Sequence, residues 1–387
     1  MRGMRCALPR RPAVLATALL LILGGCLSPR AVEANRVLAD IAARAGPSSL
    51  KATTPAPERR AVAYSVGTRR RAADLYLPGG GVEPAAGLVL VPGLAPEGKD
   101  DPRLSALAAT LARARFAVLV PDIASLRAQR VDPANIREIA DALAHLTDRD
   151  AGLAAGRAGL TAISYAVGPA LLAALEPDVR DRVELFVGVG GYHDLEAVIA
   201  FFTTGHYRTR PDGPWRRRTP NEYGKWVFVE SNLTRLSDAR DRELLRAMAA
   251  RRRGDAGAGL GDLAAGLGPE GRSVYALLTN TDPARVGALI AGLPAAMRAD
   301  LAALDLAHRD LSTLAARVIL VHGRDDPIIP SSQSVALAAA LPPGQARLFL
   351  VDRLAHADLR PGNDLLDTLT LWRAVELLLQ WRDGVAD

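Results

Sequence analysis

Apolar residues along this chain alternate between short unbroken runs and longer stretches in which they recur every three or four positions. The unbroken runs predict strands that are buried on both faces of a sheet, and the longer stretches predict amphipathic helices. The predicted strands of this kind are 87–91, 116–120, the first part of 157–168, 183–189, 317–321 and 346–351. Strands and helices that alternate through short connections predict a parallel sheet with right-handed crossovers.

Two regions depart from this rhythm. The runs 61–66 and 72–77, joined through Gly67, predict a β-hairpin. The block 193–312 holds no pair of buried strands and predicts a helical cap over the carboxyl edge of the sheet. The predicted fold class is therefore α/β, a mostly parallel, doubly wound sheet with a helical cap insertion, whose core comprises 59–192 and 313–387.

Single stretches carry further expectations. In the last helix, 364–381, the spacing places five apolar residues on the inner side: Leu365, Leu369, Trp372, Val375 and Leu379. The arginine run 216–218, beside Trp215, predicts a solvated surface; contact with lipid headgroups or an anionic substrate is the alternative.

The amino terminus reads as an export signal. Four arginines and an apolar run, 13–23, precede Cys26, and this run is about half of the roughly 20 residues that a membrane span requires. A short buried helix is the other interpretation. The residues Leu-Gly-Gly-Cys at 23–26 resemble a bacterial lipobox, which implies that 1–25 are removed and that Cys26 is lipidated. Residues 26–58, rich in proline and polar groups, predict a tether, with a weak helix at 32–44.

The lipobox resemblance also implies a location. Leu27 stands where an aspartate commonly retains lipoproteins at the inner membrane. The expectation is therefore a lipid anchor in the bacterial envelope, at the outer membrane and facing the periplasm.

Composition narrows the function. The 387 residues are 49% hydrophobic and 4% aromatic, which suits one large α/β domain with an insertion. The net charge of +6 includes four arginines of the predicted signal, whose removal leaves 44 basic and 42 acidic side chains. This balance gives no indication of a nucleic-acid partner. The two cysteines, Cys6 and Cys26, leave nothing for a disulfide, a thiol nucleophile or a zinc–thiolate site.

The stretch 157–175 predicts a strand, a sharp turn and a helix, with Ser164 at the apex. This is the geometry of a nucleophile elbow, although an ordinary buried strand–helix junction has the same pattern. Ala162 and Ala166 stand where the usual pattern has glycines. A nucleophilic serine needs a base and a carboxylate to orient it. Candidates follow the last two predicted strands, at Asp325–Asp326 and at His356.

The order Ser164, Asp326, His356, each after a predicted strand, resembles the α/β-hydrolase superfamily over residues 61–381. The resemblance implies that Ser164 is the nucleophile, His356 the base and Asp326 the acid, with Asp325 as second choice. It further implies an oxyanion hole built from the amides of Tyr165 and Leu94. It implies no cofactor and no metal.

The leading hypothesis is a membrane-anchored serine hydrolase that cleaves an ester or thioester of a small molecule or lipid. One alternative is a non-catalytic envelope lipoprotein that binds through a hydrolase scaffold, which the alanine-flanked elbow favours. Another is a peptidase with the same triad. Three further histidines have expected roles. We expect His193 and His206, near the cap entrance, to line the substrate pocket rather than to form a metal pair, and His322 to be structural.

Overall fold

The computed structural model describes residues 28–148, 156–210, 212–352, 354–356, 358–359 and 364–385. The predicted signal peptide and Cys26 lie outside these residues. The framework is an eight-stranded sheet, in the order β1-β2-β4-β3-β5-β6-β9-β10. All neighbours from β4 to β10 are parallel, whereas β1–β2 and β2–β4 are antiparallel. The strands are β1 (Glu58–Val66), β2 (Arg69–Leu77), β3 (Ala86–Val91), β4 (Phe116–Pro121), β5 (Ala158–Ile163), β6 (Leu185–Val189), β9 (Arg317–Gly323) and β10 (Ala346–Val351).

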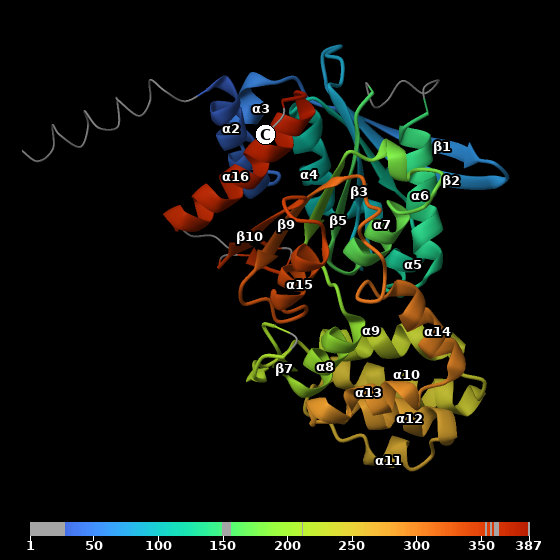
Figure 1. The fold of residues 1–387 in the computed structure, drawn as a ribbon. Coiled ribbons are helices and arrows are strands. Elements are labelled where there is room, and N and C mark those ends of the chain that lie inside the picture. Colours follow the sequence, from blue (N-terminus) through green and yellow to red (C-terminus); the bar gives the residue numbers. More distant parts are fainter. Residues whose placement is uncertain are drawn as a thin grey trace, which may run out of the picture.

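Helices cover both faces of the sheet (Figure 1). On one face lie α4 (Pro102–Arg113) and α16 (Leu365–Arg382), and on the other lie α5 (Ala124–Arg127), α6 (Ala134–Leu146), α7 (Val167–Ala173) and α15 (Ser332–Ala340). Alternate residues of β3 face opposite helical layers. Leu88 and Leu90 belong to the core layer of α4 and α16, and Val89 and Val91 belong to that of α5, α6, α7 and α15. Full burial of each such side chain contributes about 1.5–3 kcal/mol, so the central strands have a single possible register.

The amino-terminal segment is folded: the weak helix predicted at 32–44 is present as α2, whereas the prediction that residues 29–53 form a tether is wrong. Helix α2 (Pro29–Ala43) packs on α16 and α4, and the short α3 (Ser49–Thr53) packs on α2. The physical reason is an apolar stripe at Ala34, Val37 and Leu38, which is buried in the core layer of α16. The Arg382 guanidinium donates to Glu33 at 2.8 Å and so fixes α2 to the last helix.

The cap forms a separate group of helices beyond one end of the sheet (Figure 1). Its helices are α8 (Leu195–Thr204), α9 (Tyr223–Asn232), α10 (Ala239–Gly254), α11 (Gly261–Ala264), α12 (Pro269–Leu278), α13 (Val286–Ala291) and α14 (Ala295–Leu304). A small strand pair, β7 (His206–Tyr207) and β8 (Arg216–Arg217), joins α8 to α9. The chain enters and leaves the cap side by side, because Asp305 Oδ1 accepts the Leu195 amide at 2.9 Å and the Tyr192 hydroxyl donates to the Leu304 carbonyl at 2.9 Å.

Helix α16 buries its apolar side chains mainly in its second half, while the predicted Trp372 is half-buried and donates to the Ala31 carbonyl of α2 at 3.0 Å. Val375 and Leu379 are buried as predicted, but Leu365 and Leu369, assigned to the inner side, are 69% and 48% exposed. The apolar period continues to the start of the helix, whereas the buried contacts with the sheet and α2 do not.

No single helix among the described residues is both long and apolar enough to cross a membrane. Residues 283–291 and 295–304 meet the length and composition criteria only as a pair, and they are bent by 117°.

Candidate active site

Ser164 occupies the apex of the turn between β5 and α7, as predicted. Its φ is +60°, in the left-handed region that costs a non-glycine residue about 1–2 kcal/mol. The strand before it and the helix after it hold the backbone in this conformation, so the hydroxyl projects beyond the sheet edge. A turn of this kind is what the nucleophile-elbow prediction requires.

The elbow uses glycine at positions other than the two that flank the serine. Ala162 and Ala166 are fully buried, and their methyl groups fit. Close approach occurs instead at Gly168, where an added Cβ would lie 2.0 Å from the Tyr192 hydroxyl oxygen. At Gly191 an added Cβ would lie 2.4 Å from Val167 Cβ. The alanine-flanked elbow is therefore a packed variant of the turn rather than a damaged one.

The three predicted side chains meet at the carboxyl ends of β5, β9 and β10. His356 Nε2 lies 2.6 Å from Ser164 Oγ, and His356 Nδ1 lies 2.8 Å from Asp326 Oδ2. His356 also has a positive φ, +58°. Gly190 backs the pair, because a Cβ there would lie 3.5 Å from His356 Nδ1. A hydroxyl, an imidazole and a carboxylate are thus joined in one hydrogen-bonded chain.

Asp326 is fully buried and ionised. Its Oδ1 accepts the amides of Ile328 and Ile329 at 2.8 and 3.1 Å, and its Oδ2 contacts His356 and, at 3.3 Å, His322 Nε2. Burial alone would raise the pKa of this carboxyl, but the hydrogen bonds from His322 and His356 outweigh it and hold the pKa well below its ordinary range. The carboxylate therefore stays charged at neutral pH and keeps His356 oriented.

His322 contacts the Asp326 carboxylate. The sequence predicted a structural role for this histidine but did not indicate its partner. Its Nε2 lies 2.9 Å from the Ile329 carbonyl, and its Nδ1 lies 2.7 Å from Ser334 Oγ. These contacts assign the ring proton to Nε2, which faces Asp326, while Nδ1 accepts from the serine hydroxyl. The signal available in the sequence was a histidine four residues before the acid, at the end of a buried strand.

The second-choice acid, Asp325, points away from His356. Its side chain is 77% exposed and pairs with Arg218 Nη2 of the cap at 2.7 Å. Residues 324 and 325 form a turn, closed by the hydrogen bond from the Asp326 amide to the Gly323 carbonyl at 3.3 Å, and of the two aspartates only Asp326 reaches the imidazole.

The two predicted oxyanion donors lie beside Ser164. Leu94 and Tyr165 line the same cavity as the serine. An added Cβ at Gly93 would lie 3.4 Å from Ser164 Cβ, which shows how closely the loop after β3 approaches the elbow. Strands β3 and β5 are the point at which the strand order reverses, where open α/β sheets bind ligands.

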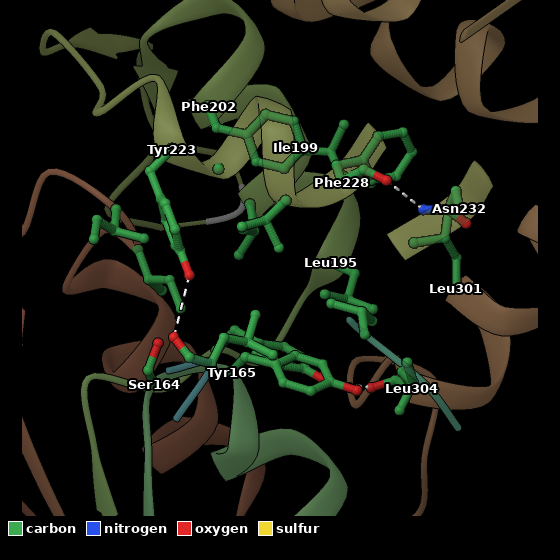
Figure 2. A pocket seen from close by; sticks show the side chains of 18 of the residues that line it. Ser164, Tyr165, Leu195, Ile199, Phe202, Tyr223, Phe228, Asn232, Leu301 and Leu304 are labelled. Carbon is green, nitrogen blue, oxygen red and sulfur yellow. Dashed lines mark hydrogen bonds between the residues drawn. The ribbon is translucent and has the colours of Figure 1, made fainter. Parts of the chain in front are cut away.

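The cavity runs from Ser164 into the cap, and its volume is about 110 Å³. Figure 2 shows Ser164 at one side and Asn232 at the other. Nearly all of the lining side chains between them are apolar, and they come from α8, α9, α14 and the acid loop: Leu195, Val198, Ile199, Phe202, Val227, Phe228, Leu301, Leu304, Ile328 and Ile329.

His193 and His206 do not line this cavity, which corrects the expectation for both. The backbone amide of His193 is bound by Gln333 Oε1 at 3.0 Å, and burial lowers the pKa of its ring. His206 Nδ1 lies 3.1 Å from the Thr204 carbonyl. Within the described residues, the one group with metal-ligand spacing is Asp352, Asp364 and Asp367, remote from both histidines in the sequence.

No protein-family model and no curated protein matches this sequence. Solved structures match it in fold. A putative hydrolase from Legionella pneumophila subsp. pneumophila str. Philadelphia 1 is similar with a TM-score of 0.56 and 12% identity, over 87% of this chain and 92% of that one. A dienelactone hydrolase from Anabaena variabilis has a TM-score of 0.43 and 16% identity, over 86% and 99%. The Legionella likeness and the sheet order together show that this chain has the α/β-hydrolase fold, as predicted.

Proposed function

We propose that this chain, an α/β-hydrolase fold with a helical cap, is a serine hydrolase that cleaves carboxylic esters. The observation that carries the proposal is the continuous chain Ser164–His356–Asp326, with contacts of 2.6 and 2.8 Å. Such a chain supplies a base at the distance that proton transfer requires. A scaffold that only bound ligands would have no need of two strained residues whose side chains meet.

The proposed reaction has two halves. His356 Nε2 takes the proton of Ser164 as Oγ attacks the ester carbonyl, and the amides of Tyr165 and Leu94 bind the oxyanion. His356 then protonates the leaving alcohol, which leaves an acyl group on Ser164. Water, activated by the same imidazole, releases the acid. Asp326 remains ionised throughout and stabilises the imidazolium.

The cavity supports a small apolar group as one half of the substrate. Its volume is about 110 Å³, of the same order as the ~150 Å³ apolar cavity that holds one benzene. Asp300, the one charged residue that lines the cavity within the described part of the chain, is paired with Arg235. An uncharged ester with a short aliphatic or an aromatic acyl group fits this chemistry better than a peptide. Retained amidase activity with little esterase activity would favour the peptidase alternative.

The decisive experiment uses the chain from residue 28, because α2 belongs to the fold. A fluorophosphonate probe should attach to Ser164, as mapped by mass spectrometry, and His356→Ala should abolish the labelling. Arg217→Gln, an exposed cap position, is the matched control and should label normally. A folded wild-type protein that resists the probe would move the assignment to a binding lipoprotein.

We further propose that Cys26 attaches the enzyme to the bacterial envelope, on the sequence argument alone. Metabolic labelling with a palmitate analogue should mark the full-length chain, and Cys26→Ala should abolish the label. Labelling that persists in Cys26→Ala, or its absence in the parent, would overturn the anchor without affecting the proposed chemistry.

A further inference from the structure

One short cap segment contacts both loops of the site. Residues 218–223, defined here as the clasp, connect β8 to α9 and begin where the Arg218 amide donates to the Gly205 carbonyl at 2.9 Å. From there the segment reaches the acid loop after β9 at one end and the loop after β3 at the other. These two loops carry Asp326 and the proposed oxyanion donor Leu94.

The Arg218 side chain binds the acid loop mainly at main-chain carbonyls of that loop. Nη1 donates to the carbonyls of Arg324 and Asp326 at 3.1 and 3.4 Å, and Nη2 donates to Asp325 Oδ1 at 2.7 Å. The guanidinium lies over the Tyr207 ring, 5.3 Å from its centroid, which restricts its position. The backbone amide of Asn221 adds a further contact with this loop, because it donates to the Pro327 carbonyl at 2.7 Å. The loop that presents Asp326 is therefore held from the cap side as well as from the sheet.

Tyr223 binds the other loop. Its hydroxyl donates to the Leu94 carbonyl at 3.2 Å and accepts from Gln129 Nε2 at 3.0 Å. Figure 2 shows the phenol directed toward the end of the cavity where Ser164 lies. Burial raises the pKa of this phenol, so it stays protonated and remains a donor. The Leu94 residue is thereby fixed relative to the serine.

We propose that Arg218 and Tyr223 are positioning residues that couple the cap to the catalytic loops. Arg218 orients the loop of Asp326, and Tyr223 orients the loop of Leu94. This inference rests on the proposed function and goes beyond it, because it makes the cap a structural part of the catalytic geometry as well as a wall of the substrate cavity. Neither residue needs to touch the reacting atoms for the rate to depend on it.

The test compares Tyr223→Phe, Arg218→Gln and Arg218→Lys with Arg217→Gln in steady-state hydrolysis of an aryl butyrate. Tyr223→Phe and Arg218→Gln should each lower kcat about 10-fold with KM changed less than about 2-fold, because transition-state geometry is lost while the cavity is kept. Arg218→Lys should recover part of the loss, since an ammonium retains one donor to the loop carbonyls. Arg217→Gln should match the parent.

A second readout separates positioning from general damage. An alkyl boronic acid forms a tetrahedral adduct with an activated serine, so its inhibition constant should rise in parallel with the fall in kcat. Thermal melting should verify that each variant is folded. Clasp variants that equal Arg217→Gln, or that raise KM at unchanged kcat, would overturn the inference. A parent protein that hydrolyses no ester and binds no boronate would instead overturn the proposed function.

Discussion

The two halves of the site are built on different principles. The half on the sheet holds Ser164, His356 and Asp326 by short hydrogen bonds and two left-handed backbone conformations. The half on the cap is an apolar wall in which Ile199, Phe202 and Phe228 act by volume alone. The sheet half therefore tolerates almost no displacement, whereas the cap half tolerates any change that preserves its shape. Chemistry and selectivity are separable in this molecule except at the clasp.

The largest effect is expected where the sheet half loses its nucleophile. Ser164→Ala should lower kcat for an aryl ester by at least about 10⁴-fold, as removal of a triad member does elsewhere. Circular dichroism should be unchanged, because the methyl group occupies the same space. Appreciable hydrolysis by a pure preparation of this variant would remove Ser164 from the mechanism.

The adjacent residues Asp325 and Asp326 allow a direct comparison of a surface carboxylate with the proposed catalytic one. Asp326→Asn should lower kcat about 10³–10⁴-fold, since an amide favours the wrong imidazole tautomer. The same change at Asp325 should cost less than about 3-fold, since an exposed ion pair contributes little. Between pH 6 and pH 8 the parent should lose no activity through protonation of Asp326, because the lowered pKa of this carboxyl leaves it ionised at both values. Equal losses at the two positions would contradict the assigned acid.

The cap half should respond through selectivity. Ile199→Trp fills part of the cavity and should lower kcat/KM for a hexanoate ester about 10-fold relative to acetate, the range expected for a few methylenes of lost space. Chemistry on the acetate ester should survive, because Ile199 makes no contact with the triad. An unchanged ratio across a series of acyl lengths would show that the acyl group lies elsewhere.

The smallest effect concerns backbone strain. The free energy of unfolding of Ser164→Gly should be about 1 kcal/mol higher than that of Ser164→Ala, because glycine adopts φ +60° without the steric cost of a Cβ atom. Urea denaturation of the two inactive variants isolates this difference. Equal stabilities would mean that the elbow relaxes once the serine is absent.

The sequence was sufficient for the sheet half. The strands themselves, the elbow at Ser164, and the acid and base after successive strands all follow from local patterns, because a parallel sheet brings its carboxyl ends together. The order of the strands within the sheet came from the structure. The choice between Asp325 and Asp326 needed coordinates, since it depends on which side of a loop faces inward.

The helical cap was predicted from the sequence, but the residues that line its cavity and the contacts of the clasp were not. Arg218 was one of three arginines predicted to be solvated, but only the other two, Arg216 and Arg217, are exposed. Its contacts with residues more than a hundred positions away leave no periodic signal. Residues 29–53 show the same limit: a helix was predicted within them, but its docking was not, because an apolar stripe of three residues indicates a docked helix only when its partner, α16, is known.

Under the proposed lipidation of Cys26, the docked helix α2 would limit the distance between the fold and the bilayer. Two residues lie between Cys26 and Pro29, and the three residue steps span about 10 Å at most. The enzyme would then lie against the lipid headgroups instead of extending away from them on a long flexible tether. Figure 1 places α2 on the opposite side of the molecule from the cap, so with that anchor the cap would face away from the bilayer. An enzyme held in this orientation would meet dissolved esters more readily than the lipids of its own membrane.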